Sequence, residues 1–384
     1  MQPKSESGCG LRPHEPSADI ALLASLQPRP MRFDLFNEAA MPPWLGLSEA
    51  ALYAELLAQI ELADGLGYGC AWLTEHHFLR GYSHASKPEL LLAAAAARTR
   101  NIRLGHGIIP LPLHHPVHVA ERVATLDALS GGRLEVGIGR GFSPRECAVF
   151  GVEMAASREI TSESLDILLQ SFARKPVTHH GARFHLDAVD IVPHVVQQPH
   201  PPLWTAAVSP QTYAWAAERE LGILAGPFKP WFMVRRDIQR YLAAWRGTTV
   251  PRVGMTIGVL CLADSARARR IAREAFSWFY RELYRVVLPV LEALYPGYEE
   301  LHELGRFRAL MKLGADFNLA ETFGMAVAGN PQEVRAKLAK YAEGGVTHLL
   351  CAMGAGAIEP AVTRESLALF AHEVMPAFAA NRGH

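Results

Sequence analysis

The sequence of 384 residues has no excess of charge of either sign, because lysine plus arginine and aspartate plus glutamate each number 38. A chain without a basic face offers no field to attract nucleic acid or an anionic membrane surface. It also contains no apolar run of the roughly 18 residues that a membrane-spanning helix needs. We therefore expect neither nucleic-acid binding nor membrane insertion.

Cysteine is scarce, and no Cys-x-x-Cys pair occurs. The five cysteines are far apart in the sequence, and Cys70, Cys261 and Cys351 lie inside apolar, strand-like runs. Buried reduced thiols of this kind favour a cytoplasmic protein over a disulfide-stabilised secreted one. The histidine pairs at 76–77, 114–115 and 179–180 also lack a metal-ligand spacing such as His-Glu-x-x-His, so we predict no metal site.

The chain does have enough apolar sequence for a large core. Apolar residues make up 49% of it and charged residues 20%, which is too apolar for a disordered chain. Residues 1–30 differ, because they hold five prolines among polar residues and an apolar stretch too short for a secretory signal. We predict a flexible N-terminal extension over residues 1–30 and one domain over residues 31–384.

Strand-like and helix-like segments alternate regularly from residue 31 onward. Each of eight strand-like segments is followed by a helix-like one, which is the pattern of a parallel α/β barrel, the (β/α)₈ or TIM barrel, rather than of an open sheet. The predicted strands are residues 31–36, 70–74, 102–109, 134–139, 203–207, 221–225, 253–262 and 346–352.

Two segments, residues 174–202 and 265–328, are too long for ordinary barrel connections and are predicted to be insertions on the barrel rim. In the second, we expect a long helix from Arg267 to about Val290, a break near Pro296 and Gly297, and further helix to about Leu313. Residues 291–328 could form a lid over the site, as long insertions often do. A structural appendage is an equally good interpretation.

One predicted helix is apolar on every face, with leucine and alanine filling each position from Leu90 to Ala97. A barrel helix normally presents a polar face to water, so we expect this one to be covered. The small side chains favour a homodimer interface. The alternative is that the chain's own insertions cover the helix.

Ionisable residues follow the second predicted strand, in the run Glu75-His76-His77-Phe78. Burying such groups is costly unless they have a function, and the carboxyl ends of barrel strands are where barrel enzymes place their active sites. The alternative is that Glu75 only holds a core histidine by a hydrogen bond. A second strand end carries Gly107 and Ile108, where glycine lets a ligand approach the backbone.

Two further strand ends have features of a phosphate site. Arg140 lies among Gly137, Gly139 and Gly141, in a spacing that does not match a dinucleotide-binding fingerprint. Ser209 is placed to cap a helix whose free N–H groups favour an anion. Together with His76, these residues predict a barrel mouth with a phosphate site and room for a flat ring.

Several motifs make the chain resemble the bacterial luciferase-like, flavin-dependent monooxygenases. The resemblance is dense from residue 31 to about 225 and weaker beyond. The residues that carry it are Glu75-His76-His77-Phe78, His115-Pro116-Val117, Leu126-Asp127, Ser130-Gly131-Gly132-Arg133, Arg140-Gly141, Val149-Phe150-Gly151-Val152-Glu153-Met154, Ser157-Arg158 and Trp215-Ala216-Ala217-Glu218-Arg219.

The resemblance implies a barrel that binds reduced FMN supplied by a separate flavin reductase. Oxygen then forms a flavin hydroperoxide that oxygenates an apolar organic substrate. The matching positions make His76 the catalytic base, with Glu75 or a backbone carbonyl fixing its tautomer. They assign the phosphate to Arg140 and Ser209, and a cis peptide bond beneath the isoalloxazine to Gly107 and Ile108.

The chain also departs from luciferase. Gly139 stands where luciferases carry a reactive cysteine, and Val208 replaces an acidic residue before the phosphate-binding serine. These changes put light emission and long-chain aldehyde substrates in doubt. Two other functions stay open: hydride transfer with a deazaflavin, and a non-catalytic flavin-binding subunit. We expect Phe142, Phe228 and Trp231 either to enclose the site or to pack beneath a lid.

Overall fold

The computed structural model describes residues 30–141, 143–294, 316–356 and 358–379. The predicted N-terminal extension, Phe142, the expected break near Pro296 and the helix expected to run to Leu313 lie outside these residues.

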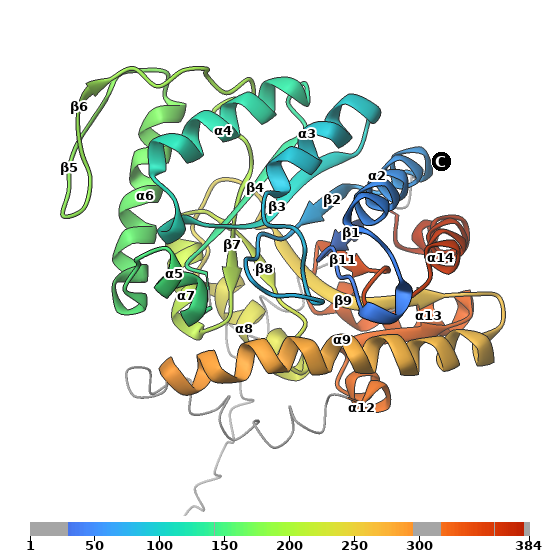
Figure 1. The fold of residues 1–384 in the computed structure, drawn as a ribbon. Helices are drawn as coiled ribbons and strands as arrows, with labels where there is room; N and C mark the ends of the chain where they lie inside the picture. The colour runs from blue at the N-terminus through green and yellow to red at the C-terminus, as the bar shows by residue number, and fades with distance from the viewer. Residues whose placement is uncertain (1–29, 142, 295–315, 357, 380–384) are drawn as a thin grey trace, which may run out of the picture.

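The core of the fold is a closed parallel barrel of eight strands, which confirms the predicted fold class (Figure 1). Parallel pairing runs from β1 to β2, β3, β4, β7, β8, β9 and β11, and β11 pairs with β1 to close the ring. The barrel strands are β1 (Arg32–Asn37), β2 (Cys70–Leu73), β3 (Arg103–Pro110), β4 (Leu134–Gly139), β7 (Leu203–Ala207), β8 (Gly222–Ala225), β9 (Val253–Cys261) and β11 (His348–Ala352).

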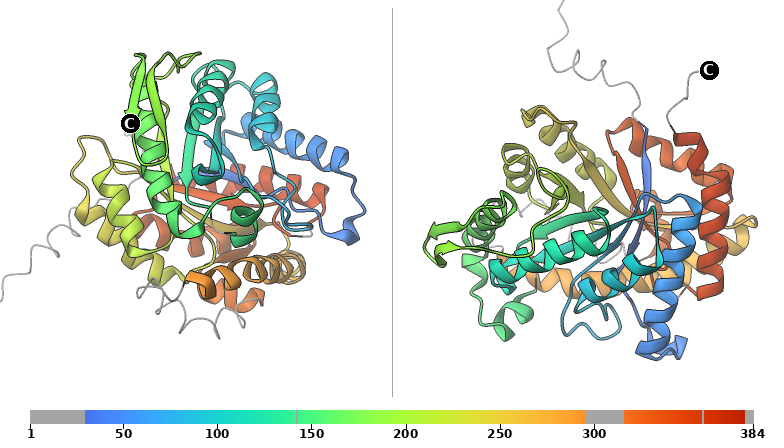
Figure 2. Two further views of the ribbon diagram at one scale, coloured as in Figure 1. Left: turned by 60° about the vertical axis from the view of Figure 1, so that its left-hand side comes forward. Right: turned by 90° about the horizontal axis from the view of Figure 1, so that it is seen from above.

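Helices surround the strands on the outside, as both views of Figure 2 show. Several begin at the cap residues that the sequence marks: Ser48, Ser209 and Asn330 each accept a hydrogen bond from a backbone N–H of the first turn. The outer helices are α2 (Glu49–Leu66), α3 (Pro88–Arg98), α4 (Pro116–Leu129), α6 (Ser157–Phe172), α7 (Pro210–Glu218), α8 (Trp231–Ala244), α13 (Pro331–Glu343) and α14 (Pro360–Glu373). A short helix, α5 (Pro144–Val149), follows β4. No helix in the described ranges is both long enough and apolar enough to cross a membrane.

The first long segment contains an antiparallel pair, β5 (Val177–His180) and β6 (His185–Val189), which is a sheet separate from the barrel. The pair projects away from the barrel beyond α6 (Figures 1 and 2).

The second long segment begins with α9 (Ser265–Leu294), a helix of 30 residues that extends past the predicted end. In Figure 1 it lies across the end of the barrel toward which the strand arrows point. After α12 (Phe317–Thr322), the chain adds β10 (Ala326–Gly329), which pairs in parallel with β9. The sequence analysis missed β10, because its four residues include only one strong strand former, Val327, between alanines and a glycine.

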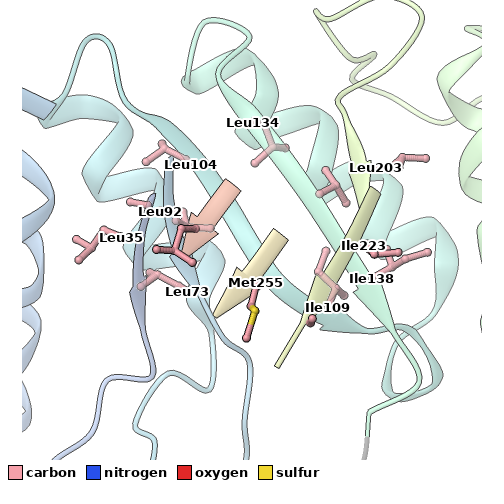
Figure 3. Close-up of a cluster of buried hydrophobic side chains, with 14 of the residues drawn as sticks. Leu35, Leu73, Leu92, Leu104, Ile109, Leu134, Ile138, Leu203, Ile223 and Met255 are labelled. Carbon is pink, nitrogen blue, oxygen red and sulfur yellow. The ribbon is translucent and has the colours of Figure 1, made fainter. Parts of the chain in front are cut away.

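Apolar side chains fill the layer between the barrel and the helices, where Figure 3 shows leucine, isoleucine and methionine from successive strands and α3. Inside the barrel, the rings of Trp72 and Trp204 meet edge to face with 5.4 Å between centroids. Their Nε1 atoms donate to Asp34 Oδ2 at 2.9 Å and to Glu135 Oε2 at 2.7 Å.

The two tryptophans need neighbours without side chains. A β-carbon at Gly105 would overlap the Trp72 ring, and one at Gly222 would overlap the Trp204 ring. Trp72 and Trp204 therefore block the amino-terminal part of the barrel, as side chains do in this fold. Near the carboxyl ends, the inward positions Gly107, Gly139 and Ala206 are small and leave the mouth open.

Candidate active site

A cavity of about 320 Å³ lies at the carboxyl ends of the barrel strands. Its volume is in the usual range for a small-molecule site. All six residues predicted for the site line it, from four different strand ends: Glu75, His76, Gly107, Ile108, Arg140 and Ser209. Residues far apart in the sequence are thus brought together as the barrel topology requires.

His76 lies between two buried carboxylates that the sequence analysis missed. Its Nε2 is 3.6 Å from Oε2 of Glu38, and its Nδ1 is 3.8 Å from Oε1 of Glu146. Both glutamates are almost fully buried and line the cavity. Glu38 directly follows β1 and Glu146 lies in α5 just after Arg140, so their place after barrel strands was the signal that could have found them.

These neighbours change the proton affinity of the ring. Burial lowers the pKa of His76, but the contact with Glu146 and the charges of Glu38, Glu146 and Glu75 outweigh burial and raise the pKa above 6.5. The imidazole is therefore a group that can hold or release a proton close to neutral pH.

Glu75 has a different role from the expected one of fixing the His76 tautomer. Its Oε1 lies 2.6 Å from Nε2 of His114 and 3.1 Å from Nε2 of His77. Burial raises the pKa of Glu75, but these two contacts and the charge of Arg122 hold it below its usual value. Glu75 thus contacts His77 and His114, while Glu38 and Glu146 flank His76.

The peptide bond between Gly107 and Ile108 is cis, as the resemblance implies. Gly139, where the resemblance places a luciferase cysteine, lies against Ile108. A β-carbon at Gly139 would lie 2.9 Å from Cδ1 of Ile108, so the isoleucine side chain takes the space that a side chain at 139 would need.

Polar donors also line the cavity, from the strand ends after β4 and β7 and from the start of α6. Nε and Nη2 of Arg140 donate to Oγ of Ser157 at 3.1 and 3.0 Å. Ser209 caps α7, and its Oγ lies 3.1 Å from Oγ1 of Thr212. The sequence analysis gave no role to Arg158, Gln211 or Thr212, although Arg158 stands in a motif that it quoted, and all three line the cavity.

These donors fit a phosphate. Two guanidinium groups, Arg140 and Arg158, and the N-terminus of α7 with its hydroxyls are the groups that bind phosphate in proteins.

The remaining walls fit a flat ring and an apolar substrate. Phe36 and Ile108 line the barrel side, while Leu283 and Val287 of α9 and Phe228 close the cavity from the rim. Trp231 does not enclose the site: it begins α8 and packs edge to face on Tyr341, with 4.8 Å between ring centroids. Within the described ranges, no three histidine, cysteine, aspartate or glutamate side chains are arranged to hold a metal ion.

Comparison with curated proteins finds relatives, several of which are named monooxygenases. A protein of Sinorhizobium fredii called y4wF is 30% identical over 313 residues, covering 81% of this chain and 87% of that protein. Limonene 1,2-monooxygenase of Rhodococcus erythropolis is 29% identical over 357 residues, covering 90% and 87%. The oxygenase component of a flavin-dependent trigonelline monooxygenase of Acinetobacter baylyi is 29% identical over 182 residues, covering 47% and 50%.

Solved structures show the same fold. The monooxygenase RslO1 of Streptomyces bottropensis superposes with a TM-score of 0.76 at 26% identity, covering 91% of this chain and 100% of that one. The oxygenating constituent of 3,6-diketocamphane monooxygenase of Pseudomonas putida, in complex with FMN, gives 0.69 at 23%, covering 90% and 98%. A coenzyme F420-dependent tetrahydromethanopterin reductase of Methanopyrus kandleri gives 0.66 at 21%, covering 91% and 99%, so these last two likenesses concern the fold alone.

The sequence model that matches this chain is that of the luciferase-like monooxygenases, and the match extends over residues 31–348. That span includes seven barrel strands and the first residue of β11, and all the cavity residues named above lie inside it. The chain therefore belongs to the luciferase-like monooxygenase family.

Proposed function

We propose that this protein is an FMN-dependent monooxygenase that uses reduced FMN and O₂ to oxygenate an apolar organic substrate. The observation that carries the proposal is one cavity that combines phosphate donors, a flat apolar wall and a histidine between carboxylates. The flavin-dependent trigonelline monooxygenase and the limonene 1,2-monooxygenase, both named above, support a flavin cofactor and an apolar substrate class.

Each group has a task in this proposal. Arg140, Arg158 and Ser209 bind the phosphate, and Gly107 with Ile108 supports the ring. Reduced FMN, when bound, supplies the electrons that activate O₂. His76 holds or moves a proton at its ring nitrogens, with Glu75 maintaining the strand end that carries it. The apolar rim side chains exclude water from the reacting groups.

We also propose a separate flavin reductase as a partner, because a relative is named as the oxygenase component of a larger system. A cytoplasmic location is supported by Cys70, Cys147, Cys261 and Cys351, which are buried free thiols.

A homodimer through α3 is a further part of the proposal. Within the apolar stretch, Leu92, Ala95 and Ala96 pack inward, but the Leu90 side chain is 69% exposed on the outer face of the helix. Sedimentation analysis should give a mass near twice the 42.1 kDa of one chain. We expect Leu90→Glu to shift this mass toward that of a monomer. A single-chain mass for the unaltered protein would contradict the proposal.

The cofactor is tested by anaerobic titration of the purified protein with reduced FMN and, in parallel, with reduced F420. We expect saturable binding of FMN and much weaker binding of F420. After mixing with oxygen, the absorbance of oxidised flavin should return more slowly from the complex than from free FMN, because the cavity shields the ring.

The other outcomes distinguish the alternatives. Binding of F420 without FMN would contradict the monooxygenase proposal in favour of hydride transfer with a deazaflavin. Tight FMN binding with reoxidation as fast as in free solution, for every substrate screened, would indicate a non-catalytic flavin-binding subunit.

A further inference from the structure

We propose that Glu38 is a positioning residue that faces the Nε2 side of the His76 ring and stabilises its protonated form through its charge. The contact of 3.6 Å between Nε2 and Oε2 of Glu38 is the basis of the proposal. Only its kinetic consequence rests on the proposed function.

The Glu38 carboxylate is fixed in place before it meets the ring. The hydroxyl of Thr74 donates to Oε2 at 2.8 Å, and the hydroxyl of Tyr82 donates to Oε1 at 3.0 Å. Thr74 is 3% exposed and Tyr82 is 1% exposed, so water does not compete for either hydroxyl. A buried carboxylate with both oxygens engaged presents a fixed charge to Nε2.

The opposite side of the ring is also defined. Glu146 faces Nδ1, and its Oε1 accepts the backbone N–H of His77 at 2.7 Å, so its position depends on the chain segment that carries His76. Glu75 adds charge from the same segment, and the Tyr82 ring lies 5.8 Å from the His76 ring. Among these groups, Glu38 alone faces Nε2, and it comes from the segment directly after β1.

Nε2 and Oε2 of Glu38 are 3.6 Å apart, which is too far for a direct hydrogen bond, so Glu38 acts on the ring through its charge and no covalent bond changes. Because the carboxylate favours the protonated ring, removing its charge must make the ring a weaker base.

The test is an NMR titration of the His76 ring in the cofactor-free protein, with its signal assigned by loss in His76→Gln. In Glu38→Gln, which has nearly the same shape without the charge, we expect the proton affinity of the His76 ring to fall roughly tenfold or more. Glu38→Asp keeps the charge on a shorter side chain, so its His76 proton affinity should lie between those of the unaltered protein and Glu38→Gln. Glu218→Gln, the same change at an exposed site at the end of α7, should leave the titration unchanged.

An unchanged titration in Glu38→Gln would overturn the proposal. If that variant does not fold, Glu38→Asp takes over the test, because drawing the charge away from Nε2 must still lower the affinity. The titration needs neither flavin nor oxygen, so its failure is separate from failure of the proposed function. Where oxygenation is measurable, the limb of its pH profile set by His76 should move to lower pH in Glu38→Gln by the same amount as the NMR titration. A purely structural role would not produce that agreement.

Discussion

Replacing His76 with alanine is expected to leave the affinity for reduced FMN within about twofold and to lower oxygenation by roughly 10²–10⁴-fold, the usual contribution of a positioned acid–base group. The proposed phosphate donors come from other strand ends than His76: Arg140 follows β4 and Ser209 follows β7, whereas His76 follows β2. The proton transfer, in contrast, depends on the imidazole and on the carboxylates at its two nitrogens. The measurement is the fraction of consumed oxygen that appears in oxygenated product, at saturating reduced FMN.

A matched control is His118→Ala, which removes a histidine from the exposed surface of α4. It should change neither binding nor product yield. Unchanged product yield in His76→Ala would remove His76 from the mechanism, and a large loss of FMN affinity would assign it to binding instead.

The barrel itself could be predicted because its evidence is repeated along the chain. Every barrel strand is an apolar run followed by a helix signal, so the fold does not depend on any single segment. The strand β10 does not follow this pattern. Ala326–Gly329 has only four residues, and its pairing with β9 is what identifies it as a strand.

The site was predictable where a residue type stands out in its local sequence. Arg140 among glycines and the pair His76-His77 are unusual next to strands, so local sequence was enough. Glu38 is a single glutamate after a strand, and nothing local tells it from a surface residue. Its partners Thr74 and Tyr82 are 36 and 44 positions away, so its role emerges only when β1 and β2 lie side by side.

The direction of the Glu75 side chain illustrates a related limit. Glu75 and His76 are adjacent in the sequence, which suggested that one orients the other. Adjacent residues in extended chain point to opposite sides, so Glu75 reaches His114 while His76 meets Glu38. The alternating direction of side chains at the strand end could be predicted from the sequence. The residues that Glu75 and His76 contact could not, because they come from distant segments.

Replacing Arg140 with alanine is expected to weaken FMN binding by roughly 10–100-fold, the usual effect of losing charge-assisted hydrogen bonds to a phosphate. Riboflavin, which has the same ring without the phosphate, should bind within about twofold of its affinity for the unaltered protein. The fold should tolerate the change, because Ser157, the partner of Arg140, still donates its hydroxyl to the carbonyl of Met154 at 2.6 Å. The measurement is a pair of anaerobic titrations with the two reduced flavins.

The control for this change is Arg145→Ala, which removes an exposed arginine five positions along the same loop and helix. It alters the net charge of the protein by the same amount but should leave both flavins bound as before. Equal losses for FMN and riboflavin in Arg140→Ala would refute the phosphate role, because a residue that supports only the ring cannot distinguish the two ligands. A loss of affinity confined to FMN, which becomes smaller as the salt concentration is raised, would locate the phosphate at Arg140. The flavin ring would then be oriented toward Gly107 and His76.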